Sequence, residues 1–310
     1  MPPKRKFDTE LAALEALRDV SPEAAEQELA EALGLRNNFL VAKAATVALH
    51  HRLTALTPLL VAAFPRFLEN SVKSDPQCWA KNAIAKALAA FEYQEPEIFL
   101  NGMRHIQLEP VWGGASDTAG TLRGTCALGL VQCREVNSHR VLTHLTPLLA
   151  DKELTVRVNA ARAIEQVGTD SAALLLRLRA ELASDGPELL GACYSGVLAL
   201  EGASAIPWVA QFLGAEDDPA AEAALAIAQT HTAEAFQTLH TAFTGVRDPW
   251  FRTAVLSAIA LTRRQEATDW LLALIENEEQ YAGDAHAALC RSAPSPMTLE
   301  RLNQLGKPCL

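Results

Sequence analysis

Asp151-Lys-Glu-Leu-Thr-Val-Arg-Val-Asn-Ala-Ala-Arg-Ala-Ile-Glu-Gln-Val-Gly168 is the stretch that decides the fold. Its apolar residues recur at helical spacing, at Leu154, Val158, Ala161 and Ile164, and so form one face of a helix. The aspartate that opens the stretch can accept hydrogen bonds from the first turn, and the closing glycine supplies a left-handed stop. We therefore predict one helix here, with small alanines that let a neighbouring helix approach closely.

The same unit recurs along the chain. Arg157–Ile164 aligns with Arg252–Ile259, and Ala205–Trp208 aligns with Ala267–Trp270. These offsets correspond to about three and about two periods of roughly 31 residues. Self-similarity at this period, with two helices in each unit, predicts an all-α fold: an α-solenoid of about eight or nine helix pairs.

The motif Asp-x-x-x-x-Val-Arg-x-x-Ala-Ala-x-Ala-Ile, followed by glycine, resembles the second helix of a HEAT repeat. It is most similar to the short bacterial kind found in phycobilisome-lyase-like HEAT proteins. The resemblance is clearest over residues 140–290, looser over 37–135, and weakest in the first 35 and last 20 residues. It implies a superhelical array whose concave face, lined by the second helix of each repeat, contacts partners.

The period also predicts the domain organisation. We expect a single solenoid over residues 1–310, with capping helices over 1–35, repeats over 36–290, and a C-terminal cap and tail over 291–310. Each repeat contacts only its neighbours, so the length of the chain does not require a second core.

Cysteine usage and hydropathy indicate the compartment in which the protein works. Six cysteines lie at positions 78, 126, 133, 193, 290 and 309, without Cys-x-x-Cys or Cys/His zinc spacing. Cys126 and Cys133 lie seven positions apart on one helix face, and we interpret them as small buried hydrophobic side chains rather than a redox pair. We expect all the thiols to be reduced. The N-terminal residues lack a signal-peptide segment, and no apolar run has the length of a membrane span. We expect a cytoplasmic protein with no metal, no cofactor and no membrane contact, and the resemblance implies a bacterial one.

Charge is distributed unevenly. Residues 36–150 carry 11 basic and 8 acidic side chains, although the whole chain has a formal net charge of −10. We predict that Lys43, Lys81 and Arg123 lie on or near the concave side and contact a partner there. Two interpretations remain open, an ordinary solvated surface and a groove for an acidic partner. The acidic balance does not favour nucleic acid, whose binders need several phosphate contacts.

Five tryptophans stand out in a chain with 6% aromatic residues. Trp208 and Trp270 occupy equivalent repeat positions, which indicates core packing. Trp250 lies in a predicted first helical turn, where we expect it to be half exposed and able to contact a partner. Trp112 lies in Gln107–Ser116, the longest break in the helical pattern, and such breaks are functional or are insertions. We predict that Trp112 contacts a partner.

Two aspartate–arginine pairs recur at the helix starts, Asp151 with Arg157 and Asp248 with Arg252. In HEAT repeats the matching residues often bond between neighbours. The resemblance therefore implies a structural ladder for these four residues.

Motifs of catalysis are missing from the sequence: it has no Gly-x-Ser-x-Gly, no phosphate-binding loop and no His-Glu-x-x-His. Two enzyme interpretations rest on the resemblance alone. One is a phycobilin lyase, and the other is an alkylpurine DNA glycosylase, for which Trp112, Asp117 and Arg123 could form the site. We favour a non-catalytic scaffold or adaptor that binds a protein on its concave face, and leave enzymatic activity open.

Overall fold

Stacked helical hairpins build the chain, and they form two units, Met1–Val167 and Gly168–Leu310, each with its own core. The computed structural model describes residues 3–182, 184–278 and 280–309, and side chains from residue 7 onward. The predicted all-α solenoid class is confirmed, since helices account for nearly all regular structure in these residues. The prediction of one continuous array, with boundaries near residues 35 and 290, stays a prediction.

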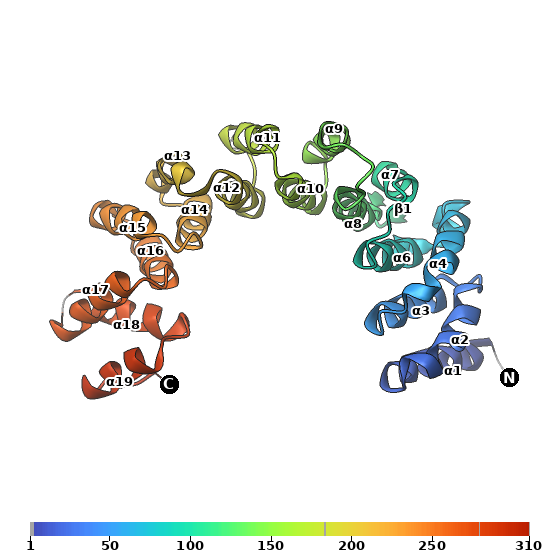
Figure 1. Ribbon diagram of the computed structural model, residues 1–310, viewed down its shortest axis with the longest axis horizontal. Coiled ribbons are helices and arrows are strands. Elements are labelled where there is room, and N and C mark those ends of the chain that lie inside the picture. The colour runs from blue at the N-terminus through green and yellow to red at the C-terminus, as the bar shows by residue number, and fades with distance from the viewer. Residues whose placement is uncertain (1–2, 183, 279, 310) are drawn as a thin grey trace. The chain divides into compact units, whose positions relative to one another are not determined.

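Unit 1 is a two-layer stack (Figure 1). Its elements are α1 (Pro3–Ala16), α2 (Pro22–Leu33), α3 (Asn38–His50), α4 (Thr57–Ala63), α5 (Ser71–Ser74), α6 (Trp79–Ala90), α7 (Glu97–Arg104), β1 (Leu108–Val111), β2 (Gly114–Asp117), α8 (Gly120–Val131), α9 (Ser138–Leu149) and α10 (Leu154–Val167). Helices α3, α6, α8 and α10 pack in succession as one layer. Helices α2, α4, α7 and α9 form the other layer, each packed on its partner in the first.

Small residues set the spacing between these helices. Gly129 of α8 faces the ring of Phe99 in α7, where a Cβ atom would lie 2.3 Å from a ring carbon. Both residues belong to a buried contact, and Phe99 has no exposed surface. Glycine here lets α7 and α8 approach more closely than any side chain would allow.

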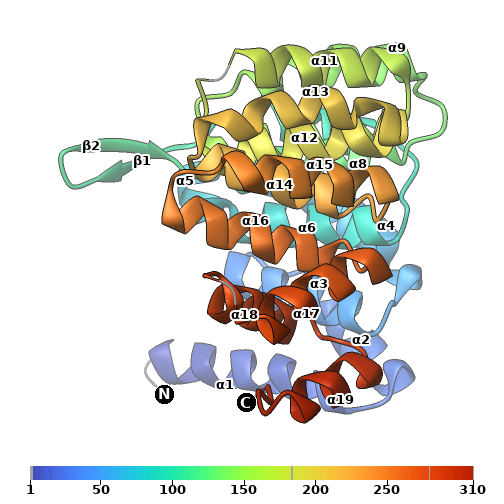
Figure 2. The same ribbon diagram turned by 90° about the vertical axis from the view of Figure 1, so that its left-hand side faces the viewer.

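Unit 2 repeats the same architecture (Figure 2). Its helices are α11 (Asp170–Glu181), α12 (Pro187–Glu201), α13 (Ile206–Ala210), α14 (Asp218–Ala228), α15 (Ala233–Gly245), α16 (Pro249–Leu261), α17 (Gln265–Glu276), α18 (Ala282–Arg291) and α19 (Pro296–Gln304). Helices α12, α14, α16 and α18 pack in succession, and α11, α13, α15 and α17 cover them. A proline in the first turn and an aspartate cap start both α14 and α16, with Asp217 as the cap of α14 and Asp248 as the cap of α16.

One described stretch, Pro187–Ala215, is long and apolar enough to cross a membrane, with a mean hydropathy of 1.4. It was not expected from the sequence. In the structure it is broken at Gly202 (φ 69°) between α12 and a 3-10 turn, and 56% of the apolar window is buried. A core helix of a solenoid has the same composition, and α12 packs on α11 and α14.

A β-hairpin replaces the irregular loop expected at residues 107–116. Strands β1 and β2 pair antiparallel, from Leu108 opposite Asp117 to Val111 opposite Gly114. The two-residue turn is Trp112-Gly113, and Gly113 has a φ of 87°, which suits the tight turns of hairpins. Figure 2 shows the hairpin projecting away from the helices of unit 1. The strands carry no alternating apolar pattern because both faces are largely exposed.

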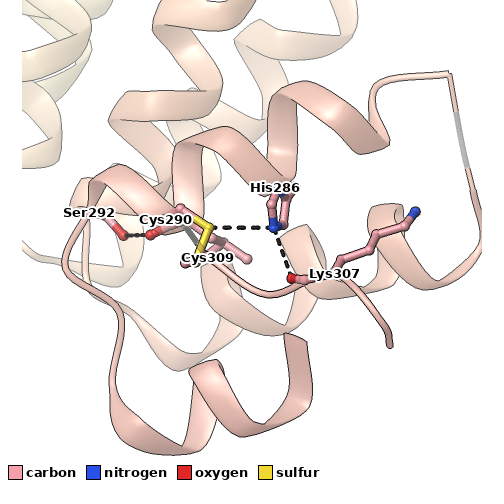
Figure 3. The surroundings of a disulfide bond; sticks show 6 residues. His286, Cys290, Ser292, Lys307 and Cys309 are labelled. Carbon is pink, nitrogen blue, oxygen red and sulfur yellow. Dashed lines mark hydrogen bonds between the residues drawn. A yellow bond between two sulfur atoms is a disulfide. The ribbon is translucent and has the colours of Figure 1, made fainter. Parts of the chain in front are cut away.

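The expectation that all thiols are reduced is wrong for two of the six. Cys290 of α18 and Cys309 form a disulfide, with their Cα atoms 5.4 Å apart (Figure 3). The tail after α19 returns alongside α18, so residues 19 positions apart meet. No short spacing marks such a pair. The other four cysteines are free and buried, and for Cys126 and Cys133 the burial was predicted.

Candidate functional site: an aromatic pocket and its hairpin

A hollow of about 620 Å³, here called the aromatic pocket, lies over α1, α3, α6 and the approach to α8 in unit 1. Phe39 and Trp79 supply its aromatic lining, with ring centroids 5.3 Å apart. Their side chains are 43% and 49% exposed. Phe7 lies edge-on against Phe39 at 6.3 Å. Adjacent half-exposed rings in a chain this poor in aromatics are typical of an interaction site.

The charged lining of the aromatic pocket has an excess of cations. Lys43 lines it and pairs with Glu15 at 2.7 Å. The hydrogen bond and charge of Lys43 lower the pKa of Glu15. Lys86 also lines the pocket, is exposed, and makes no ion pair with another described residue. An exposed pair such as Lys43–Glu15 contributes little, so both lysines can turn to an incoming carboxylate.

A left-handed turn forms the edge of the aromatic pocket. Gln77 and Cys78 have φ values of 58° and 56°, and both line the pocket directly before Trp79. Non-glycine residues pay about 1–2 kcal/mol each in this conformation. Strain of this kind persists only when the surrounding structure holds it, and it concentrates at functional sites.

Asp75 holds this turn from inside the fold. Its carboxylate accepts hydrogen bonds from the main-chain N–H groups of Ala80 and Lys81, at 2.9 and 3.0 Å. The side chain of Asn38 in α3 donates to the same carboxylate at 3.0 Å. The start of α6, and with it Trp79, is thereby fixed relative to α3.

Lys81 was predicted to contact a partner, and that prediction is wrong for this structure. Its side chain is fully buried, as is that of Asp75, and the ammonium lies 3.0 Å from the Asp75 carboxylate. The ammonium also donates to the carbonyl of Phe67 at 3.0 Å. The side chain thus reaches the turn after α4, where Phe67 lies, and is not exposed to solvent. A helix position alone did not reveal this because the partner acid lies outside the helix.

The hairpin is anchored to the pocket edge through Glu109. Its carboxylate accepts from the main-chain N–H of Gln77 at 2.5 Å and from the hydroxyl of Thr118 at 2.7 Å. Gln107, just before β1, donates to the carbonyl of Asp75 at 2.9 Å. Burial tends to raise the pKa of Glu109, but these hydrogen bonds outweigh it and lower the pKa. The hairpin base and the strained turn therefore form one connected structure.

Arg123 was also predicted to contact a partner, and it is 4% exposed instead. Its guanidinium donates to Asp117 at 2.6 Å and to Asp151 at 2.9 and 3.1 Å. A further bond reaches the carbonyl of His105 at 3.0 Å. Burial tends to raise the pKa of Asp117, but main-chain hydrogen bonds, first from Gln107, and the Arg123 charge lower it overall. Arg123 thus ties the hairpin base to the next repeat.

The four ladder residues are placed as follows. Asp151 bonds the arginine of the preceding repeat, Arg123, as described above. Arg157 donates to the carbonyl of Asp151 at 2.8 Å, and Arg252 donates to the carbonyl of Val246 at 2.8 Å. The Asp248 carboxylate caps the first turn of α16. Both arginines therefore brace the loop that precedes their own helix.

The two exposed tryptophans predicted as contacts lie in different units. Trp112 is completely exposed at the hairpin tip, and Trp250, in the first turn of α16, is 53% exposed. The glycosylase-like set is not assembled as a free site, because the Asp117 carboxylate is bound by Arg123.

Sequence reasoning did not select Phe39, Trp79 or Lys86. A signal was present for Phe39, an aromatic residue two positions after the cap Asn37, in the first turn of an alanine-rich helix.

Comparisons with known proteins give little beyond the fold. No family model matches the chain, and no curated protein matches its sequence. Among solved structures, the chain is similar to the complex of CpcE and CpcF of phycocyanin lyase from Nostoc sp. PCC7120. The identity is 17%, the TM-score is 0.41, and the match covers 81% of this chain and 93% of that one.

Proposed function

We propose that unit 1 is a protein-binding module that holds a segment of a partner protein in the aromatic pocket. The supporting observation is the half-exposed Phe39–Trp79 pair beside the hollow. The adaptor is non-catalytic in this proposal and works in the cytoplasm. When a partner covers the exposed half of one such ring, the apolar surface removed from water contributes about 2 kcal/mol to the free energy of binding. This is the contribution of a binding hot spot.

The lining defines the chemistry of the segment. An apolar or aromatic side chain fits against the two rings, and a carboxylate next to it fits Lys86 and, after exchange with Glu15, Lys43. Asn82 lines the same hollow and accepts a hydrogen bond from Thr125 at 3.0 Å, so neutral polar groups are also available. Of the two interpretations of the basic middle segment, the groove for an acidic partner is the one that this lining supports.

The hairpin supplies a second contact. Trp112 is held out at its tip with no intramolecular cover, while the base is fixed to the pocket edge through Glu109 and Gln107. A ring on a short, anchored hairpin loses little conformational freedom on binding, which favours affinity. Trp250 lies in unit 2, and its contact role stays a separate prediction.

Selection from a phage-displayed library of random peptides tests the proposal. We expect the wild-type chain to enrich peptides that place Asp or Glu beside an aromatic or aliphatic residue. Trp79→Ala should lower the affinity for the selected peptides by at least about tenfold, the equivalent of 1.4 kcal/mol of binding free energy. Leu178→Ala is the control, since it removes an exposed apolar side chain of unit 2 that has no predicted contact role, and it should leave peptide binding unchanged.

Three results would count against the adaptor. The first is equal binding of the selected peptides to Trp79→Ala and wild type. The second is linear tetrapyrrole that remains on the chain after denaturation, which would instead support a lyase. The third is release of alkylated base from DNA by the purified chain, which would support a glycosylase.

A further inference from the structure

Three side chains of types that can bind a metal ion lie close together in unit 2. His286 and Cys290 lie one turn apart on α18, and Cys309 lies in the tail that follows α19 (Figure 3). Their ligand atoms are all within 4.8 Å of one another. The Nε2 atom of His286 is 3.5 Å from Sγ of Cys290 and 2.9 Å from the carbonyl oxygen of Lys307.

We propose that these three residues form a zinc site when the Cys290–Cys309 disulfide is reduced. Tetrahedral zinc, with Zn–S near 2.3 Å and Zn–N near 2.0 Å, separates a sulfur from a nitrogen ligand by roughly 3.5 Å. The Sγ of Cys290 and Nε2 of His286 already have that spacing. Two groups have to move: the sulfur of Cys309 must withdraw to roughly 3.8 Å from the other sulfur, and the carbonyl of Lys307 must leave the in-plane direction of Nε2 of His286.

The ligand set suits the charge of the ion. Two thiolates and one neutral imidazole neutralise Zn²⁺, and a Cys2His set leaves the fourth position to water. All three residues are partly exposed rather than deeply buried, so an ion can reach them. The four remaining cysteines are buried, free and held elsewhere in the fold, and burial raises the pKa of each of their thiols.

Reduction of the disulfide precedes metal binding. An external dithiol gives two electrons and two protons to the disulfide, leaving two protein thiols and the oxidised form of the dithiol. Binding of Zn²⁺ then releases both thiol protons to water. The carbonyl of Lys307 can only accept, so Nε2 of His286 carries the proton while that bond exists. The imidazole has to shift its proton to Nδ1 before Nε2 can bind the metal.

The same cluster can therefore link the C-terminal tail to α18 in two alternative ways. In the oxidised form the disulfide and the His286–Lys307 bond hold it. In a reducing compartment, where glutathione and thioredoxin open accessible disulfides, zinc would hold it through Cys309. The inference concerns unit 2 and does not depend on the proposed role of unit 1.

Cobalt titration tests the site directly. The full chain is reduced with dithiothreitol under argon, freed of reductant, and titrated with Co²⁺ alone. We expect thiolate-to-cobalt charge-transfer absorption and tetrahedral d–d bands that saturate at one ion per chain. Added Zn²⁺ should abolish them. Native mass spectrometry with Zn²⁺ should give the mass of one zinc less two protons.

The oxidised chain is the first control, because it keeps every residue and should show no such bands. His286→Ala should weaken the affinity for Co²⁺ by more than roughly tenfold, since even outer-shell partners matter that much. His139→Ala, which removes an exposed histidine of unit 1, should leave it unchanged. Bands in the oxidised chain, no bands in a reduced chain with unchanged circular dichroism, or equal affinity in His286→Ala would each overturn the proposal.

Discussion

Replacing Lys81 by methionine removes one charge from a fully buried pair and keeps most of the side-chain volume. The ammonium lies 3.0 Å from the Asp75 carboxylate, and neither side chain has exposed surface. The variant leaves the Asp75 carboxylate buried without its counter-charge. Removal of one partner from such a pair costs about 3–5 kcal/mol. Asp75 keeps three hydrogen bonds from Asn38, Ala80 and the main chain of residue 81, so we expect a loss near the lower end, about 3 kcal/mol.

Urea denaturation followed by far-ultraviolet circular dichroism measures this loss. Lys86→Met is the matched control: it makes the same change in the same helix at an exposed position, where the effect should stay within about 0.5 kcal/mol. Adding Asp75→Asn to Lys81→Met should recover part of the stability, because the buried group is then neutral. The reasoning fails if Lys81→Met loses less than about 1 kcal/mol, or if the double variant is the least stable of the set.

Three further outcomes follow from single contacts. The pKa of Asp117 is lowered in the fold, so its contribution is present above the ordinary value of 3.8 and is lost as pH falls through the lowered value. Wild type should therefore lose more unfolding free energy than Asp117→Asn between neutral pH and about pH 3, as urea midpoints at each pH will show. Gly129→Ala brings a Cβ atom to 2.3 Å from the Phe99 ring and should cost about 1–3 kcal/mol. Gly245→Ala meets no atom within 4 Å and should gain up to about 1 kcal/mol; calorimetry that ranks the two glycine variants the other way refutes the packing argument. Reducing the disulfide in the presence of a chelator opens a loop of 19 residues and should cost about 3 kcal/mol. Faster amide exchange in α18 and α19 is the expected sign, and unchanged exchange would contradict it.

The sequence by itself determined the repeat. The period of about 31 residues, the aspartate and proline at helix starts, and the alanines where helices touch are local or nearest-neighbour properties. They identify an α-solenoid because each helix pair needs only the next one to bury its apolar face. For the same reason the sequence indicated Trp112 and Trp250 as exposed: one interrupts the repeat, and the other precedes the apolar face of its helix.

Only the tertiary structure decided what the charged and sulfur-containing side chains do. Lys81 and Arg123 look like surface cations in a basic segment, yet each is buried against an acid outside its own helix: Asp75, in the turn just before α6, and Asp151, in the next repeat. Asp75 lies outside the helix that carries Lys81, and Asp151 lies a repeat beyond Arg123, so neither pairing follows from helical periodicity. The cysteine pair is hidden for a related reason, since the tail that carries Cys309 returns to α18 only after a further helix. Periodicity reports which face of a helix is apolar, and the partner of a buried charge or thiol is set by which turns of distant segments come to rest beside it.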